Sequence, residues 1–194
     1  MALTVKESGA NFQKVPEGVH HAICIGMFDI GTRHDEKWNK DIHKVIIMWE
    51  LPYEIEGIDR PMAISKKYTL SLSEKANLRK DLEAWRGKAF TKEQLAAFDI
   101  LKILGANCQL QVIHSEYDGK VYANVAAIMA LPKGTEIKQP ENPIRKFSFE
   151  EYDHSLNLDE SIPEWIRKMI EEANEYKAGA APADREFDSE LEPF

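Results

Sequence analysis

Three segments in the first part of the chain alternate between apolar and other side chains in the way that β-strands do. They are Gly18–Ile30, His43–Leu51 and Met62–Leu70. In the first segment both alternating sets are largely apolar, which predicts a long strand buried on much of both faces. In the second segment Trp49 shares a face with Val45, which favours packing in the core. Residues 31–41 and 52–61 predict a loop and a turn between these strands.

The hydrophobic period then changes from that of strands to that of helices. Ser73–Trp85 has apolar residues at helical intervals, with Ser73 as the predicted N-cap. Thr91–Leu104 carries a second apolar stripe, and its first residues fit a capping box. Alternation returns in Asn107–Tyr117 and Lys120–Leu131, and the Asp-Gly dipeptide between them predicts a hairpin.

The order of these elements predicts a mainly β protein. We expect a five-stranded Greek-key barrel of the OB type, with a helical insert between strands 3 and 4 and a C-terminal helix. A β-sandwich and an α+β domain are the alternatives that this order leaves open. The expected C-terminal helix spans Ser161–Lys177, and its Trp165 falls at core spacing, as Trp85 does in the insert. The predicted divisions are an N-terminal arm at 1–17, the barrel at 18–134, a linker with the C-terminal helix at 135–177, and a flexible acidic tail at 178–194.

Composition supports a folded core, because 43% of the residues are hydrophobic and 30% are charged. The net charge is −8, and it is unevenly distributed. Residues 184–194 carry a net −4 and residues 147–183 a net −6, which leaves +2 for residues 1–146. An acidic end on a slightly basic body suggests a module that binds a polyanion. A mildly amphoteric domain with a solvated tail would show the same asymmetry.

Several functional classes are disfavoured by what the sequence lacks. No apolar run reaches the roughly 20 residues that span a bilayer, and residues 1–15 do not have the pattern of a signal peptide. The two cysteines, Cys24 and Cys108, are too few for a disulfide scaffold or a four-thiolate zinc site. We therefore expect a soluble cytoplasmic protein with no membrane contact, no metal and no other cofactor.

The last 11 residues form the sharpest motif of the chain, because they contain 5 acids and end on Pro-Phe. An apolar tip with a free carboxylate can enter a basic-rimmed pocket of another protein while the acids steer the encounter. The simpler interpretation is an acidic tail that keeps the protein soluble. The predicted protein-binding residues are Asp188, Glu190, Leu191, Glu192, Pro193 and Phe194.

Five short motifs lie in the body of the chain: Asp29–Thr32, Trp49–Leu51, Ser65–Thr69, Leu78–Leu82 and Trp85–Gly87. With them, the region from about Gly18 to Gly134 resembles a family of tailed-phage single-stranded DNA-binding and replication proteins. The tail independently resembles that of bacterial and phage single-stranded DNA-binding proteins, which end in acids followed by Phe. The resemblance implies an OB fold and sequence-tolerant binding of single-stranded DNA in phage replication or recombination.

The same resemblance implies further properties. It implies that the protein uses no cofactor, that it acts in the host-cell cytoplasm, and that the tail recruits replication or recombination proteins. The long helical insert and the near-neutral body depart from the cellular members of this class. These departures leave the oligomeric state open, including a homo-oligomer.

Binding of an unpaired strand requires cations for the phosphates and rings for the bases. Each stacked base contributes about 1–3 kcal/mol whatever its identity. Trp38 is the most distinctive ring, because it lies in a polar loop with no core to join. The candidate nucleic-acid-binding residues are Arg33, Lys37, Trp38, Lys40, Lys44, Trp49, Arg60, Lys66, Lys67, Tyr68, Tyr117, Lys120 and Tyr122.

We expect no catalytic residues. The segment Asp29–Thr32 is similar to the phosphate turn of actin-like ATPases, but the chain is too short for that fold and has no second phosphate loop, which favours a strand end with a glycine turn. Two other function classes stay open. One is an OB-like adaptor with little affinity for nucleic acid, suggested by the near-neutral body. The other is an enzyme such as a small nuclease, for which no metal-carboxylate motif is visible.

Overall fold

A sheet of six strands forms the centre of the protein in a computed structural model. The structure describes the backbone of residues 14–55 and 58–180, and the side chains of these residues except 52–60 and 180. The hydrogen-bonded order is β3-β2-β1-β4-β5, all antiparallel, and β6 pairs parallel to β1. The two outer strands β3 and β5 also lie beside each other. The strands are β1 (Gly18–Asp35), β2 (Lys40–Ile55), β3 (Ile58–Thr69), β4 (Asn107–Tyr117), β5 (Lys120–Met129) and β6 (Arg145–Phe147). The prediction of a mainly β protein is confirmed.

The long strand β1 has different partners along its length. Its residues 18–23 pair with β4, and residues 26–28 pair with β6. An irregularity in the pairing with β2 falls between Cys24 and Gly26. Because such a bulge shifts the alternation by one residue, Cys24 and Met27 both face the main core. The simple alternation that the sequence predicts for this strand is therefore wrong beyond Cys24.

Helices follow the third strand and the sixth. They are α1 (Asn77–Arg86), α2 (Lys92–Ala96), the 3-10 helix η1 (Ile100–Ile103), α3 (Glu164–Glu171) and α4 (Asn174–Ala180). The capping box at Thr91 is confirmed, but the helix expected over Thr91–Leu104 stops at Ala96, because the Asp99 side chain caps the new turn of η1. The predicted N-cap Ser73 is also wrong, since Ala76 holds that position.

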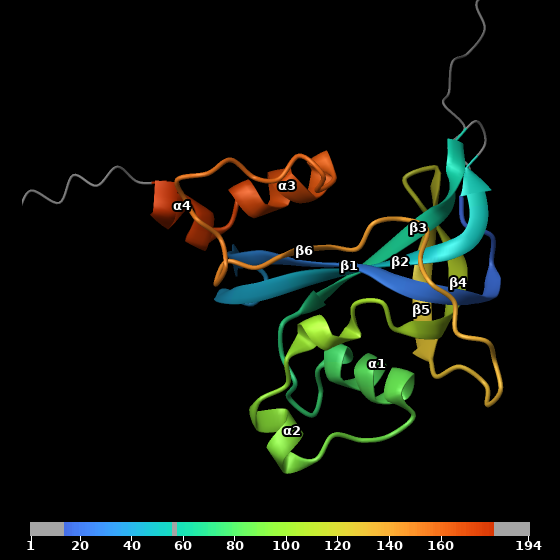
Figure 1. The fold of residues 1–194 in the computed structure, drawn as a ribbon. Helices are drawn as coiled ribbons and strands as arrows, with labels where there is room; N and C mark the ends of the chain where they lie inside the picture. The colour runs from blue at the N-terminus through green and yellow to red at the C-terminus, as the bar shows by residue number, and fades with distance from the viewer. Residues whose placement is uncertain (1–13, 56–57, 181–194) are drawn as a thin grey trace, which may run out of the picture.

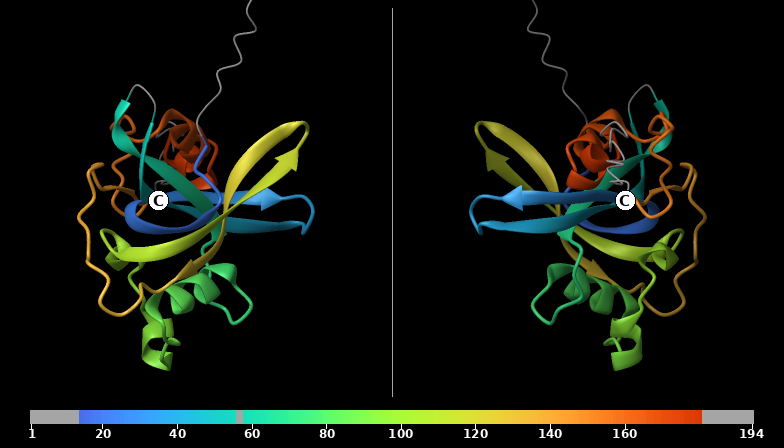
Figure 2. Two further views of the ribbon diagram at one scale, coloured as in Figure 1. Left: turned by 90° about the vertical axis from the view of Figure 1, so that its right-hand side faces the viewer. Right: turned by 90° about the vertical axis from the view of Figure 1, so that its left-hand side faces the viewer.

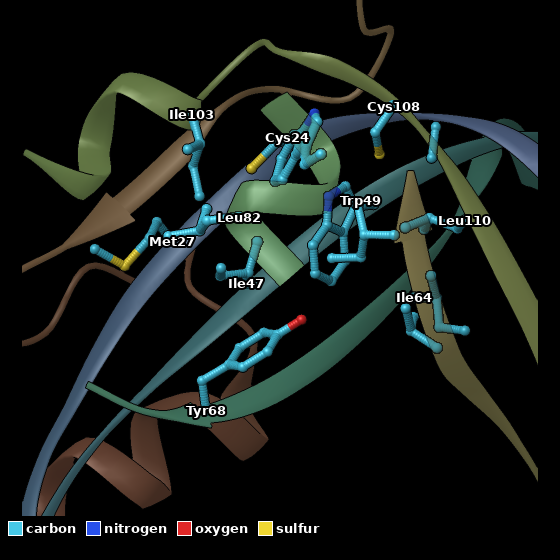
Figure 3. Close-up of a cluster of buried hydrophobic side chains, with 14 of the residues drawn as sticks. Cys24, Met27, Ile47, Trp49, Ile64, Tyr68, Leu82, Ile103, Cys108 and Leu110 are labelled. Carbon is cyan, nitrogen blue, oxygen red and sulfur yellow. The ribbon is translucent and has the colours of Figure 1, made fainter. Parts of the chain in front are cut away.

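Two apolar clusters cover opposite faces of β1 and β2, as the sequence predicts for a strand buried on both sides. The main core lies between the strands and the helical insert, with Trp49 and Leu82 at its centre (Figures 1 and 3). The second core lies under α3, where Ile166 and Ile170 pack against Phe28. The C-terminal helix therefore docks on the sheet. It is broken near Ala173 and so forms α3 and α4 instead of one helix.

Of the two helical tryptophans expected at core positions, only Trp85 is confirmed. Trp85 is buried and its indole nitrogen donates to the Asn107 carbonyl at 2.9 Å. Trp165 is 44% exposed on the outer side of α3. None of the helices in residues 14–180 is both long and apolar enough to cross a membrane.

Candidate nucleic-acid interface

A groove of about 540 Å³ runs along the C-terminal end of β3, between the first residues of β2 and the start of α1. We call it the lysine groove. Five lysines line it, and no Asp or Glu is among its described lining residues. The groove lies within residues 1–146, which carry a net charge of +2 in a chain of net charge −8. The lining residues are Lys40, Lys44, Lys66, Lys67, Tyr68, Thr69, Ser71, Ser73, Lys75, Ala76 and Asn77.

The lysines of the groove differ in their availability. Lys66 donates to the Asp81 carboxylate at 2.8 Å, and Lys44 lies 3.8 Å from a carboxylate oxygen of Asp35. Lys40, Lys67 and Lys75 are exposed and have no carboxylate within salt-bridge distance among the described residues. These three are the cations free to meet a phosphate.

Lys67 lies near two other cations. Partial desolvation lowers the pKa of Lys67, and the cations of Arg33 and Lys44 lower it further, while the carboxylate of Glu172 acts in the opposite direction. Crowded cations repel one another, and a bound anion relieves that repulsion.

The start of α1 adds to the positive potential of the groove. Its N-cap is Ala76, which provides no side-chain acceptor, and no acidic residue lies in its first turn. The helix dipole is therefore not offset by a carboxylate within the first turn of α1. Lys75, Ala76 and Asn77 at this helix end line the groove together with the other lysines.

Two hairpins carry exposed rings on the same side of the molecule as the loop that follows β3 (Figure 2). Trp38, at the β1–β2 turn, is 64% exposed, with the Lys37 ammonium 5.5 Å from its ring centroid. On the β4–β5 hairpin Tyr117 is 76% and Tyr122 46% exposed, and Lys120 is exposed between them. These residues lie where the sequence placed them, but none of them lines the lysine groove.

Two of the predicted stacking rings are buried and are corrected here. Trp49 is fully enclosed by the main core, beside Trp85 at 6.0 Å between ring centroids. Tyr68 has its ring in the same core, and its hydroxyl donates to Asp81 at 2.8 Å (Figure 3). Lys66 and Tyr68 thus share one carboxylate of α1, so this pair braces the insert against β3. Neither ring can stack on a base in this conformation.

Arg33 is also engaged within the fold. Its guanidinium forms an ion pair with Glu172 at 2.8 Å and donates to the Met169 carbonyl at the end of α3. A carbonyl at a helix C-terminus carries partial negative charge, so a cation is stabilised there. The structure places Arg33 as a clamp on α3, although its charge still acts on Lys67.

Sequence reasoning missed a polar network between β1, β2 and α4. His43 contacts the Asp29 carboxylate at 2.6 Å, and the Glu175 carboxylate accepts from the Thr32 amide at 2.8 Å and the Thr32 hydroxyl at 2.5 Å. The hydrogen bond to Asp29 raises the pKa of His43. Burial acts to raise the pKa of Glu175, but the bonds from Thr32 outweigh it and hold the pKa below its ordinary value.

This network gives the segment Asp29–Thr32 a structural role, which accounts for its residues without a bound nucleotide. Gly31 has φ +67, and a Cβ there would lie 2.5 Å from the Ala173 Cβ and 2.6 Å from a Glu175 oxygen. Asp29 accepts from the Gly31 amide at 2.9 Å. The strand end that the sequence favoured here is wrong, because β1 continues to Asp35 and Gly31 lies at an irregularity in its pairing with β2. The positive φ of Gly31 leaves room for the junction of α3 and α4. No local signal links these residues, because about 140 positions separate Thr32 from Glu175.

Two groups of predicted residues lie outside this description. The side chain of Arg60 is not among those described, although its backbone lies in β3. The tail residues Asp188, Glu190, Leu191, Glu192, Pro193 and Phe194 lie beyond residue 180. A scan against protein-family models finds no match for the chain, and a search of curated proteins finds none either.

Proposed function

We propose that the protein binds single-stranded DNA without strong sequence preference and performs no catalysis. The observation that carries the proposal is the lysine groove, which gathers five lysines and no described carboxylate in an acidic chain. A row of cations suits a phosphate backbone, because neutralised phosphates release condensed counterions. Exposed rings at the two hairpin tips add stacking surfaces that accept any base.

We propose further that the sheet is an OB-type barrel. The order β3-β2-β1-β4-β5, the closeness of β3 to β5 and the helical insert between β3 and β4 all support this assignment. In an OB fold the face of strands 2 and 3 and the loops 1–2 and 4–5 bind oligonucleotides. Most of the lysine groove lies on β2, β3 and the loop after β3. Trp38 lies in the loop between β1 and β2, and Tyr117 and Tyr122 lie in β4 and β5 beside the loop that joins them.

The proposed role of each residue in DNA binding follows from its partners in the fold. Lys40, Lys67 and Lys75 would contact phosphates, while Lys44 contributes its charge from beside Asp35. Trp38 would stack on a base, and Lys37 would reach the phosphate next to it. Several nucleotides of one strand would then run from the hairpin rings to the lysine groove.

On its sequence alone, the acidic tail ending in Phe194 is proposed to recruit replication or recombination proteins of a phage in the host cytoplasm. Its charge is opposite to that of the lysine groove, so we expect the tail to compete with DNA at low salt. Removal of residues 184–194 should leave DNA affinity equal or higher. A loss of affinity on removal would contradict this assignment.

A salt titration with matched lysine variants tests the proposed groove. The triple variant Lys40→Ala, Lys67→Ala, Lys75→Ala removes the three free cations, and each phosphate contact contributes about 0.7 to the salt slope for single strands. We expect the slope of log Kd against log salt for a labelled oligo-dT to fall by about 2.

The control variant removes as much charge from elsewhere on the surface. Lys88, Lys92 and Lys133 are exposed and lie outside the groove. Their triple alanine variant should change the slope far less, because only long-range potential is lost. If both triple variants weaken binding equally, the groove is not the site and the proposal fails.

A further inference from the structure

A second hollow has the opposite charge to the lysine groove. It is a cleft of about 780 Å³ where the sheet, the helical insert and the segment after β6 meet. Nine of its fifteen lining residues are apolar and five are titratable. We call it the acidic-rimmed cleft. It is lined by Met27, Asp29, His43, Val45, Leu70, Leu72, Leu78, Phe98, Asp99, Ile100, Leu101, Ser148, Phe149, Glu150 and Glu175.

The apolar lining of this cleft is partly open to solvent. Met27 and Val45 at its base belong to the main core, and Leu70 on its wall is 40% exposed. Leu72, Phe98, Ile100, Leu101 and Phe149 are half-buried around it. Apolar surface that converges on a concave site with a few polar groups is the usual character of a binding pocket.

The charged lining is almost entirely acidic. Four carboxylates meet one histidine, and no Lys or Arg is among the lining residues. Asp29 and Glu175 are engaged with His43 and Thr32. Asp99 and Glu150 are exposed, on the insert and on the segment after β6, and neither has a basic partner within salt-bridge distance in the described part of the chain.

The charge of the cleft determines which occupant fits it. Even with His43 protonated its lining has a net negative charge, so it repels a nucleic acid and also the tail of this chain, whose last 11 residues carry −4. A second copy of the chain could bring the cations of its lysine groove, but the large apolar side chain that lines that groove, Tyr68, is buried and cannot enter the cleft. A partner must bring apolar groups for the base and cations for the rim.

We infer that the acidic-rimmed cleft is a docking site for a peptide segment of a partner protein. The segment places an apolar side chain against Leu72, Ile100 and Phe149, and an adjacent Lys or Arg pairs with Asp99 and Glu150 across the opening. This site is separate from the lysine groove, so it does not depend on whether the protein binds DNA.

Three capped tetrapeptides test the inference with the full-length protein. They are Lys-Leu-Phe-Arg, the charge-reversed Glu-Leu-Phe-Asp and the polar Lys-Gly-Ser-Arg, and binding is followed by NMR chemical shifts of methyl-labelled protein. We expect the first peptide alone to shift the methyl resonances of Leu70, Leu72 and Ile100. If no peptide shifts them at millimolar concentration, or if all three shift them equally, the inference is overturned.

Charge-neutralising variants locate the peptide on the rim. Asp99→Asn with Glu150→Gln keeps the capping oxygen of η1 and removes both exposed charges. We expect about fivefold weaker binding of Lys-Leu-Phe-Arg at low salt, because two solvent-exposed ion pairs are lost. The control is Glu116→Gln with Glu160→Gln, two exposed acids outside the cleft.

The outcomes separate the inference from its rivals. An equal loss in both double variants would mean that the peptide senses only net charge, which overturns a located site. A peptide with the sequence of residues 184–194 is added as a competitor. If it displaces Lys-Leu-Phe-Arg from the cleft, the occupant is the tail of this chain and the inference is wrong.

Discussion

The brace between β3 and α1 gives a prediction that separates stability from binding. Tyr68 is buried, its hydroxyl donates to Asp81 at 2.8 Å, and Lys66 donates to the same oxygen at 2.8 Å. Burial raises the pKa of Tyr68, and the charge of Asp81 raises it further, so the phenol stays protonated as the donor. We therefore expect Tyr68 to matter for folding and not for contact with DNA.

The expected magnitudes follow from burial and partners. Asp81→Ala leaves the buried Tyr68 hydroxyl without an acceptor, which costs about 1–3 kcal/mol. The Lys66 ion pair adds about 1 kcal/mol at most, because both of its side chains are partly exposed. We expect a total loss of about 1–4 kcal/mol in the free energy of unfolding. Tyr68→Phe removes the hydroxyl itself, so its expected cost is about 1–2 kcal/mol.

Urea unfolding of the two single variants and the double variant measures both values and their coupling. In the double variant no buried hydroxyl is left without an acceptor. The loss in the free energy of unfolding should therefore be smaller than the sum of the two single losses by about 1–2 kcal/mol. Oligo-dT affinity of folded Tyr68→Phe should stay within about twofold of the parent.

Two results would refute this reasoning. Additive losses would show that Tyr68 and Asp81 do not interact in solution. A Tyr68→Phe variant of unchanged stability with strongly weakened oligo-dT binding would return the tyrosine to the binding surface, as the sequence alone suggested.

Three further predictions concern α4 and the hairpin ring. The pKa of His43 is raised above its ordinary value of 6.5, so its contribution to stability is complete below that pH and is lost as pH rises through the folded pKa; Glu175→Gln should reduce this pH dependence in urea unfolding, and an unaltered profile would contradict the network. Gly31→Ala should lower stability by about 2 kcal/mol or more, because φ is positive and Ala173 lies in the way, and calorimetry showing no loss would disprove the packing. Trp38→Ala should weaken oligo-dT binding by about 1–3 kcal/mol without changing the melting temperature; unaltered binding would remove Trp38 from the interface.

Local patterns predicted much of the fold, because strands and tight turns depend on neighbouring residues. The Asp118-Gly119 turn is an example: both residues have positive φ, at 50° and 69°, as a two-residue hairpin requires. The core position of Trp49 also followed from simple alternation. The face of Met27 did not, since one extra residue at the bulge beside Gly26 exchanges the two faces of the strand.

Most residues of the candidate site could be predicted from the sequence, but their arrangement in space could not. Lys40, Lys44, Lys66 and Lys67 were candidates from the sequence, and the groove brings them together. Lys75 was missed, because only the tertiary placement of α1 beside β3 carries it there. The sequence predicts that Lys66 and Arg33 bind nucleic acid, because their acidic partners Asp81 and Glu172 are distant in the chain and approach them only in the folded protein.

The most direct test of the account compares a 20-nucleotide oligo-dT with a duplex of the same length, at two salt concentrations and with the full-length protein. The account predicts preferential binding of the single strand that weakens as salt rises, because unpaired bases can stack on exposed rings while phosphates meet the lysines. Equal affinity for the two nucleic acids, or no binding to either, would contradict it.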